Sequence, residues 1–408
     1  MAGPLQGVVV LDLSRILAGP WATQVLADFG ADVIKVEHPR GGDDTRQWGP
    51  PYLADAAGQP TSESAYYLSA NRGKRSVTID FSRPEGQDLV RRLAAGADVL
   101  LENFKVGGLE RYGLGYQAIR TLNPRLVYLS ISAFGQDGPD AAKPGYDAMI
   151  QGMGGLMSLT GAPDGSPGGG PQKVGVAVAD LMCGMYAVAG ILAALQERER
   201  SGLGQYIDLS LLDSQVAWLA NQAMNYLVTG EPPTRNGTAH PNIVPYQAFA
   251  TADGHLMLAV GNDAQFERFC RAAGAAGLAA DARFASNAGR VTHRTMLVPA
   301  VEALLRLRTT TEWLAVLTAA QVPCGPINDL AQVFAEPQVR HRELRLELPH
   351  PSAGRVPGVR NPVHFGRTPI EYERPPPLLG ADTATELKAR LGLDDRTLAD
   401  LAARGIIT

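Results

Sequence analysis

One carboxylate, Asp180, stands where an acid can do chemistry. It joins the segment 172–179, which leaves a glycine-rich region, to the almost wholly apolar stretch 181–198. The pattern predicts a helix that begins near Asp180, with the aspartate as N-cap or first-turn acid. An aspartate that caps its helix stabilises the protein by about 1 kcal/mol, and this role alone would explain Asp180. The same place keeps a carboxylate ionised at neutral pH, because its ordinary pKa is about 3.9 and the helix dipole lowers it. Such a carboxylate is a nucleophile that needs no general base, so both interpretations stay open.

Basic side chains gather near three predicted strand ends. An open α/β sheet binds its ligands at the carboxyl ends of its strands, so these cations suit a polyanion such as coenzyme A. Lysines and arginines scattered over a solvated surface are the competing explanation. The groups are Lys35, His38 and Arg40; Arg72, Lys74 and Arg75; and Lys105 and Arg111. Three aromatic residues, Trp48, Tyr66 and Tyr67, fit either stacking on adenine or packing in the core.

Several common cofactor and catalytic motifs are missing from the sequence. The first predicted strand–helix turn, residues 12–20, has no GxGxxG, and no GxxxxGK[ST] occurs in the chain. Hydride transfer on NAD and P-loop phosphoryl transfer therefore lose their main support. HExxH, GxSxG and EF-hand patterns are also absent. We expect a site without a metal and without a permanently bound cofactor.

The composition excludes further classes. The chain has 408 residues and a formal net charge of −4, so it has no general attraction for nucleic acid or an anionic membrane. Its three cysteines lie far apart without a CxxC spacing, which indicates neither a disulfide framework nor a zinc site. No uninterrupted apolar run reaches the roughly 18 residues of a membrane span, and the N-terminus lacks signal-peptide features. We expect a cytoplasmic protein that binds neither nucleic acid nor membrane.

The elements that must position these residues follow an α/β pattern. Short apolar runs at 7–12 and 31–37 flank helical spacing at 20–29, which predicts a right-handed βαβ unit. Further predicted elements lie at 76–80, 84–95, 98–103 and 126–132. Together they predict an open, parallel, Rossmann-like sheet.

The chain is long for one domain, so we divide it. We expect a large α/β domain over 1–200, a linker over 201–225 and a small α+β domain over 226–325. The segment 326–408 contains further helical and strand patterns and a proline cluster at 375–377.

Long blocks in fixed order resemble the family III CoA transferases of the CaiB/BaiF type. They begin with LDLSRILAGPWATQVLADFGADVIKVE, NRGKRSVTIDF and DVLLENF, and continue through VGVAVADLMCGMYAVAGILAALQER, GQYIDLSLLDS and VPCGPIND to PPPLLG. The resemblance covers nearly the whole chain. It implies a CoA transferase that uses acyl-CoA as a substrate. It also implies an interlocked homodimer whose large domain is built from both chain ends, so that 326–408 returns to the N-terminal sheet.

The same resemblance implies roles for single residues. The catalytic aspartate of the family falls on Asp180, in the block VADLMCGMYA. Its tyrosine near the thioester falls on Tyr146. The remaining CoA-binding positions correspond to Ala18, His38, Ile79, Asn103, Phe104 and Arg111, and we add Lys74 and Arg75 as cations for the CoA phosphates.

Departures from relatives narrow the activity. Formyl-CoA:oxalate transferases have a glutamine where this chain has Leu17, and a glycine tetrad where it has the segment 260–263, so oxalate is disfavoured as acceptor. Racemases of α-methylacyl-CoA place a histidine where this chain has Tyr146, so one of their two acid/base groups is missing. A racemase-like isomerase and a non-catalytic CoA-binding protein remain the alternatives to transfer.

Within the family, the segment 236–249 most resembles succinyl-CoA:glutarate CoA transferases. We therefore expect succinyl-CoA as donor and a dicarboxylate such as glutarate as acceptor. The distal carboxylate of a dicarboxylate needs a cationic or multi-donor partner, because an unpaired buried charge is costly. The candidates are Arg15, Arg46, Arg72 and His240.

Overall fold

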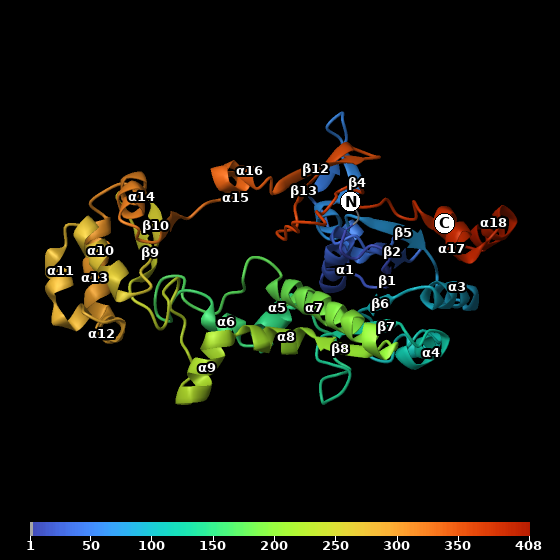
Figure 1. Ribbon diagram of the computed structural model, residues 1–408, viewed down its shortest axis with the longest axis horizontal. Coiled ribbons are helices and arrows are strands. Elements are labelled where there is room, and N and C mark those ends of the chain that lie inside the picture. The colour runs from blue at the N-terminus through green and yellow to red at the C-terminus, as the bar shows by residue number, and fades with distance from the viewer. Residues whose placement is uncertain (1–2) are drawn as a thin grey trace. The chain divides into compact units, whose positions relative to one another are not determined.

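The computed structural model describes residues 3–408, which form two compact units (Figure 1). Within the described residues, the larger unit takes in the chain up to Leu156, then Val174–Met224 and Gln338–Thr408. The smaller unit comprises Met157–Lys173 and Asn225–Pro337.

A six-stranded sheet forms the centre of the larger unit, and every neighbouring pair of its strands is parallel. Its order is β5 (Lys74–Thr78), β2 (Asp32–Glu37), β1 (Val9–Asp12), β6 (Val99–Glu102), β7 (Val127–Ser132) and β8 (Tyr206–Ser210). The strands VVLD and DVIKVE are almost wholly buried because both faces of a parallel sheet are covered. The predicted open, parallel α/β sheet is confirmed.

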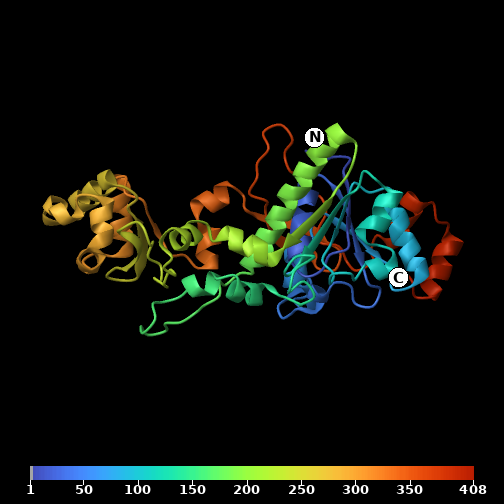
Figure 2. The same cartoon turned by 90° about the horizontal axis from the view of Figure 1, so that it is seen from below.

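Helices cover both faces of this sheet (Figure 2). On one face, α1 (Ala18–Asp28) and α7 (Val178–Ser201) bury a core that includes Val10, Leu101 and Ile191. The other face carries α3 (Pro84–Ala95), α4 (Tyr116–Leu122), α17 (Thr383–Leu391) and α18 (Asp395–Ala403). By length and composition alone α7 could cross a membrane. Its buried side packs on α1 and the sheet, which is the ordinary position of an apolar core helix.

The end of the chain lies against the edge strand β5. Asp382 Oδ2 accepts a hydrogen bond of 2.9 Å from Ser76 N, and the hydroxyls of Thr78 and Thr408 are 2.6 Å apart. Residues more than 300 positions apart in sequence thus lie together.

The stretch 201–225, which we expected to be a linker, contains structure of the larger unit. Tyr206–Ser210 forms β8, which pairs in parallel with β7, and α8 (Leu211–Trp218) follows it directly. Ile207 and Leu209 pack against the core under α7. This segment therefore completes the sheet, and the linker prediction is wrong for these residues.

The smaller unit has its own core around a three-stranded antiparallel sheet. The strands are β11 (Cys324–Pro326), β10 (His255–Ala259) and β9 (Tyr246–Ala250), in that order. Leu256, Phe269 and Trp313 are buried together between this sheet and the helices. These helices are α10 (Asp263–Ala272), α11 (Ala276–Ala280), α12 (Asn287–Thr292), α13 (Arg294–Leu305) and α14 (Thr310–Ala319).

Shorter elements complete the two units. The hairpins are β3 (Tyr52–Ala54) with β4 (Pro60–Ser64), and β12 (Arg345–His350) with β13 (Gly354–Val359). The helices are η1 (Asp44–Gln47), α2 (Ala65–Ser69), η2 (Glu110–Tyr112), α5 (Asp147–Met153), α6 (Leu156–Leu159), α9 (Ala220–Thr229), η3 (Ala282–Phe284), α15 (Leu330–Ala335) and α16 (Pro337–His341).

Candidate active site

Asp180 lies in the first turn of α7, and its residue is only 8% exposed. The helix begins at Val178 and its N-cap position is Ala177, whose side chain makes no capping bond. The capping acid is Asp147, the first residue of α5. Its Oδ1 accepts from the backbone N–H of Ala179 at 2.8 Å and of Asp180 at 3.3 Å. Of the two predicted positions, N-cap or first-turn acid, Asp180 therefore occupies the second.

A short relay fixes the side chain of Asp147 at this helix start. Its Oδ2 accepts 2.7 Å from Gln151 Nε2, and Gln151 Oε1 in turn accepts 2.9 Å from Val174 N. Gln151 is fully buried. The relay ties α5 to the chain that enters α7, so the carboxylate of Asp147 stays beside that of Asp180.

Burial, followed by the negative charge of Asp147, raises the pKa of Asp180 to about 7. Sequence reasoning expected a low pKa from the helix dipole. The dipole is already matched by Asp147, and loss of water disfavours the charged form of the buried carboxyl. Near neutral pH part of the Asp180 population is thus protonated.

The phenol of Tyr66 lies near this pair. Burial, and then the charge of Asp180, raises the pKa of Tyr66 to about 12. The Tyr66 ring packs edge-on against Trp48, with centroids 5.0 Å apart. Tyr66 is therefore a neutral O–H donor near Asp180 at physiological pH.

Asp180 lines a cavity of about 200 Å³ at the carboxyl ends of β1, β6 and β7. A second cavity, of about 650 Å³, lies beside it, and the two share Arg15, Asp44, Phe104 and Lys105. The first also includes Leu17, Ala18, Asn103, Lys143, Tyr146 and Leu211. The second is lined by His38, Arg40, Lys105 and Arg111, and also by the carboxylates of Glu37, Asp43, Asp44 and Asp80.

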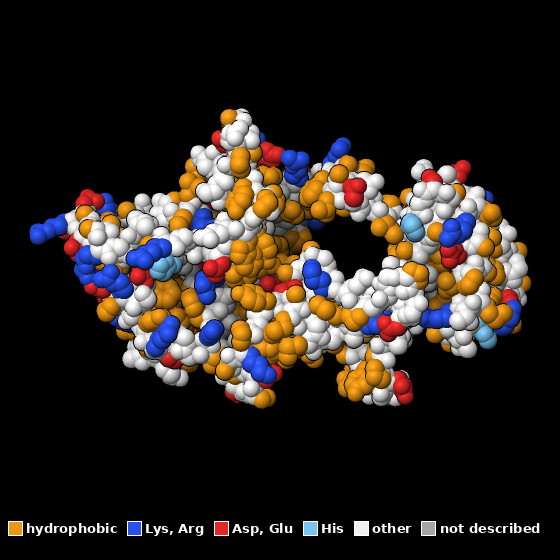
Figure 3. All heavy atoms as spheres, turned by 180° about the vertical axis from the view of Figure 1, so that it is seen from behind, with side chains coloured by type: hydrophobic (Ala, Val, Ile, Leu, Met, Phe, Trp, Pro, Cys, Tyr) orange, Lys and Arg blue, Asp and Glu red, His pale blue; other side chains and the backbone are white. Residues whose placement is uncertain are grey.

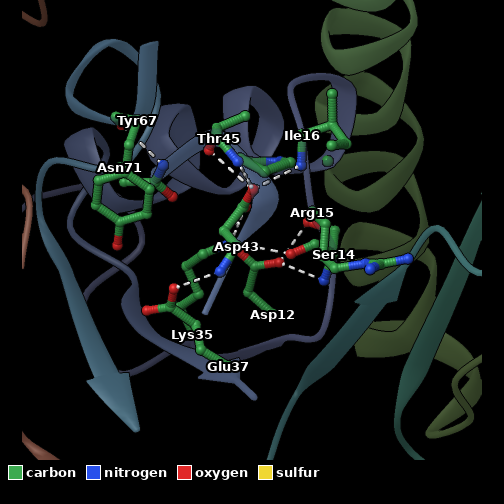
Figure 4. Close-up of polar contacts among 12 residues, drawn as sticks. Asp12, Ser14, Arg15, Ile16, Lys35, Glu37, Asp43, Thr45, Tyr67 and Asn71 are labelled. Carbon is green, nitrogen blue, oxygen red and sulfur yellow. Dashed lines mark hydrogen bonds and ion pairs between the residues drawn. The ribbon is translucent and has the colours of Figure 1, made fainter. Parts of the chain in front are cut away.

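A buried ion pair holds the loop between these cavities (Figure 4). Lys35 Nζ lies 2.9 Å from Asp43 Oδ2 and also donates 2.9 Å to Ser14 O. Asp43 Oδ1 accepts from the N–H of Ile16 at 3.2 Å and of Thr45 at 3.0 Å. Ile16 has a φ of +71°, which is a strained conformation for a β-branched residue. The ion pair thus fixes a strained turn at the rim of the cavity.

Four of the expected ligand-binding positions lie at the smaller cavity. Ala18, Asn103, Phe104 and Tyr146 line it, and the residue Tyr146 is 64% exposed. Asn103 binds the backbone of Arg15 twice, accepting at 2.8 Å from its N–H and donating at 2.7 Å to its carbonyl. His38 and Arg111 lie instead at the larger cavity.

Of the expected acceptor-binding residues, only Arg15 reaches both cavities. Its side chain is 47% exposed and faces Asp44 at 3.3 Å. The guanidinium also lies over the ring of Phe104, 5.1 Å from its centroid. Its only ionic partner within the described residues is an exposed carboxylate, so a ligand carboxylate can replace that partner at small cost.

Arg46 is already saturated by protein partners. Its guanidinium makes two 2.8 Å bonds to Glu37, one of 2.6 Å to Tyr67 Oη and one of 3.1 Å to Pro377 O. Arg72 is held in the same way by Asp28, at 2.8 and 2.6 Å, and by Val359 O. Neither guanidinium lines the cavity of Asp180, so the structure does not bring these two expected acceptor-binding residues to that cavity.

Lys74, Arg75 and Ile79 are not placed to contact CoA. Lys74 Nζ is buried and donates to Asp12, Pro20 O and Asn71 at 2.8–3.1 Å, which uses all three of its N–H groups. Arg75 lies at the start of β5, the wrong end of a parallel strand for a ligand, and pairs with Asp32 and Glu386. Ile79 is fully buried in the core.

His240 belongs to the smaller unit. Its ring stacks on Tyr246 with centroids 5.2 Å apart, and its Nδ1 accepts 3.0 Å from Asn242 N. Burial, and then the charge of Arg294, lowers its pKa. It is therefore a neutral ring near pH 7, held within the smaller unit.

Sequence reasoning missed Asp147, Lys143 and Asp44 as members of the site. Asp147 stood in the block GYD next to Tyr146, but nothing local pairs it with a helix 32 residues away. Lys143 lines the cavity and forms a 2.6 Å ion pair with Asp140. The acidic pair DD at positions 43–44 was the sequence signal for Asp43, which is buried in the ion pair with Lys35, and for its exposed neighbour Asp44.

Comparisons with known proteins identify a matching family and several similar chains. A family model described as CoA-transferase family III matches residues 5–383. The succinate–glutarate CoA-transferase of Agrobacterium fabrum is 52% identical and covers 97% of both chains. Human succinyl-CoA:glutarate CoA-transferase is 42% identical over 99% of this chain and 90% of its own. The crystal structure of a CaiB/BaiF family protein from Brucella suis superimposes with a TM-score of 0.83, at 48% identity, over 97% of this chain and 100% of its own.

Proposed function

Because the chain belongs to CoA-transferase family III and is a CoA transferase, we propose that it moves CoA from succinyl-CoA to glutarate or a closely related dicarboxylate. One observation carries the proposal. A buried carboxylate, Asp180, lines a small cavity that shares part of its wall with a larger cavity, which Arg40, Lys105 and Arg111 line. The larger cavity suits the phosphates of CoA, and the smaller one suits its thioester end.

Asp180 acts as the nucleophile. Its carboxylate oxygen attacks the carbonyl carbon of succinyl-CoA, the C–S bond breaks, and CoA leaves as thiolate with a mixed anhydride on the enzyme. The thiolate attacks the aspartyl carbonyl of that anhydride, and succinate leaves with the C–O electron pair. The acceptor carboxylate then displaces the thiolate from this aspartyl thioester. The thiolate finally attacks the acceptor acyl carbon and frees Asp180 as carboxylate.

CoA is held at the carboxyl ends of the strands. Arg40, Lys105 and Arg111 contribute positive charge to the lining of the larger cavity, and His38 lines it as well. Asn103 and Phe104 form a turn, and Phe104 lines both cavities. Along this turn CoA extends from its phosphates in the larger cavity toward Asp180 in the smaller one. A CoA molecule along this path needs no resident metal or cofactor.

Arg15 binds the distal carboxylate of the acceptor. Arg46 and Arg72 are saturated by Glu37 and Asp28, whereas Arg15 has one exposed partner, Asp44. A planar guanidinium takes a carboxylate through two parallel N–H bonds. Lys105 and Lys143 are the other cations that line the same cavity, and Lys143, which pairs with Asp140, is the matched control.

The chain works as a cytoplasmic homodimer. Exposed apolar residues support an interface, among them Met149 and Met153 on α5 and Met185 and Tyr186 on α7. The cysteines, Cys183, Cys270 and Cys324, are all free thiols, which suits a reducing compartment.

Interlocked chains part only by unfolding, so tagged and untagged protein, mixed in the native state, should form no mixed dimers. Fast exchange would rule out interlocking.

The substrate assignment is tested with succinyl-CoA and a panel of acceptors. We expect glutarate and 3-hydroxy-3-methylglutarate to be better acceptors than oxalate, butyrate or carnitine, because a C5 dicarboxylate presents a second charge to Arg15. The readout is acyl-CoA product by liquid chromatography. A clear preference for a monocarboxylate or for carnitine would refute the dicarboxylate assignment. Racemisation of an α-methylacyl-CoA, without transfer, would instead favour the isomerase alternative.

Replacing Arg15 with glutamine should selectively weaken dicarboxylates. Loss of one charge-assisted pair corresponds to roughly 1.5–3 kcal/mol, or about a ten- to hundredfold fall in kcat/KM for glutarate. The value for butyrate should change little. Lys143→Gln is the matched control and should leave the glutarate-to-butyrate ratio near that of the wild type. An equal loss for both acceptors in Arg15→Gln would show that Arg15 binds CoA instead.

A further inference from the structure

A second buried carboxyl, Glu102, lies close to the ligand cavities. It ends β6, in the middle of the sheet, and its residue is only 6% exposed. Glu102 Oε2 accepts a 2.7 Å hydrogen bond from Phe104 N. The hydroxyl of Ser130, opposite it on β7, donates to the same carboxyl. The mechanism above has no role for this group.

The bond to Phe104 N fixes the turn that borders the ligand. Phe104 lines both cavities, and Asn103, beside it, binds the backbone of Arg15 on both sides. The Arg15 guanidinium lies over the face of the Phe104 ring. The same ring packs edge-on against Phe81, with centroids 5.7 Å apart. One carboxyl therefore sets the position of the turn and, through it, of the Arg15 backbone.

The surroundings of Glu102 hold no compensating cation. Glu110 of η2 faces it as a like charge, and the phenols of Tyr128 and Tyr206 approach from β7 and β8. Within residues 3–408 no lysine, arginine or histidine forms an ion pair with it. Burial, partly offset by the bonds from Ser130 and Phe104 N, raises the pKa of Glu102 to about 7. The carboxyl therefore changes its charge within the physiological range.

We propose that Glu102 is a positioning residue that, as a carboxylate, locks the Asn103–Phe104 turn in the shape that binds CoA and, when protonated, loosens it. The proposal rests on the proposed function only in that CoA is the ligand of the two cavities. The ionised form accepts the stronger hydrogen bond from Phe104 N, because charge assistance roughly doubles the strength of such a bond. CoA affinity should therefore fall as the pH drops through neutrality.

The test measures binding of free CoA by calorimetry between about pH 6 and pH 8.5. An Asp180→Asn background removes the other carboxyl that titrates in this range. Ionisation of the CoA phosphates is common to all variants and cancels in the comparison. In this background we expect affinity to fall severalfold from pH 8.5 to pH 6.

Adding Glu102→Gln should weaken binding at pH 8.5 by roughly three- to tenfold, the loss of one charge-assisted bond. Little further pH dependence should remain beyond that of the ligand. Glu110→Gln is the matched control, a nearby carboxylate without a bond to the turn, and it should keep a pH-dependent affinity with a midpoint at lower pH. Should Glu102→Gln fold poorly, Glu102→Asp withdraws the charge from Phe104 N and should also weaken binding at pH 8.5.

A pH dependence in Glu102→Gln equal to that of its parent would overturn the proposal. So would unchanged affinity at pH 8.5 in both Glu102 variants. Failure of the Asp180→Asn parent to bind CoA at any pH would instead contradict the placement of CoA in these cavities. The two failures are thus distinguishable.

Discussion

Replacing Asp180 with asparagine is expected to reduce CoA transfer by more than about a thousandfold, as the loss of an enzymatic nucleophile usually does. Asparagine has nearly the shape of aspartate but forms no anhydride. The assay is CoA transfer from succinyl-CoA to glutarate, with CoA binding measured in parallel. Affinity for CoA should remain, because the cations at the larger cavity, such as Arg40 and Arg111, do not depend on Asp180.

The stability of the same variant provides an internal control. The folded-state pKa of Asp180, about 7, lies above its ordinary value of 3.8, so the folded protein loses stability as the pH rises from about 4 through about 7. Asparagine removes that penalty. At pH 8 the free energy of unfolding of the Asp180→Asn variant should thus exceed that of the wild type by on the order of a few kcal/mol. No such gain is expected near pH 4. Transfer activity above a few per cent of wild type would contradict a nucleophilic role.

The second large effect concerns pH. Only ionised Asp180 attacks a thioester, so kcat/KM for succinyl-CoA should rise with pH and level off above a midpoint near the Asp180 pKa of about 7. At pH 6 we expect roughly a tenth of the plateau activity, as one titrating group gives. A rate profile from pH 5.5 to 9 measures this.

Asp147→Asn separates the two causes of that midpoint. Asparagine keeps an oxygen that can accept from Ala179 N and Asp180 N, but it removes the charge beside Asp180. The midpoint should move to lower pH, while burial, the larger cause, keeps it above the ordinary aspartate value. Asp147→Ala also removes the helix cap, so it should in addition lower the free energy of unfolding by about 1 kcal/mol. An unchanged midpoint in Asp147→Asn would show that this charge does not act on Asp180.

The sheet was predictable because its strands are short apolar runs bounded by turn residues. Val9–Asp12 and Asp32–Glu37 flank an apolar helix, and a parallel arrangement follows from the crossover. The edge strand β8 was missed. It follows the longest helix after only the short loop 202–205, so the segment resembled a linker. Its place in the sheet depends on pairing with β7, which lies about 80 residues earlier.

The site was predictable where family blocks mark it and not where tertiary contacts make it. Asp180, Asn103 and Arg15 were identified from sequence, and the structure brings them to neighbouring walls. Arg46 and Arg72 gave the same sequence signal as Arg15, yet Glu37 and Asp28 saturate them. The predicted direction of the Asp180 pKa shift was also wrong, since the shift depends on burial and on the charge of Asp147.

Trapping the aspartyl thioester tests the central claim most directly. The enzyme is mixed with succinyl-CoA without acceptor, quenched in acid within seconds, digested and analysed by mass spectrometry. The account predicts one CoA adduct, on the peptide that contains Asp180, which hydroxylamine converts to a hydroxamate and added glutarate discharges as glutaryl-CoA. Asp180→Asn should give no adduct. An adduct on another residue, or transfer at full rate with no adduct on Asp180, would contradict it.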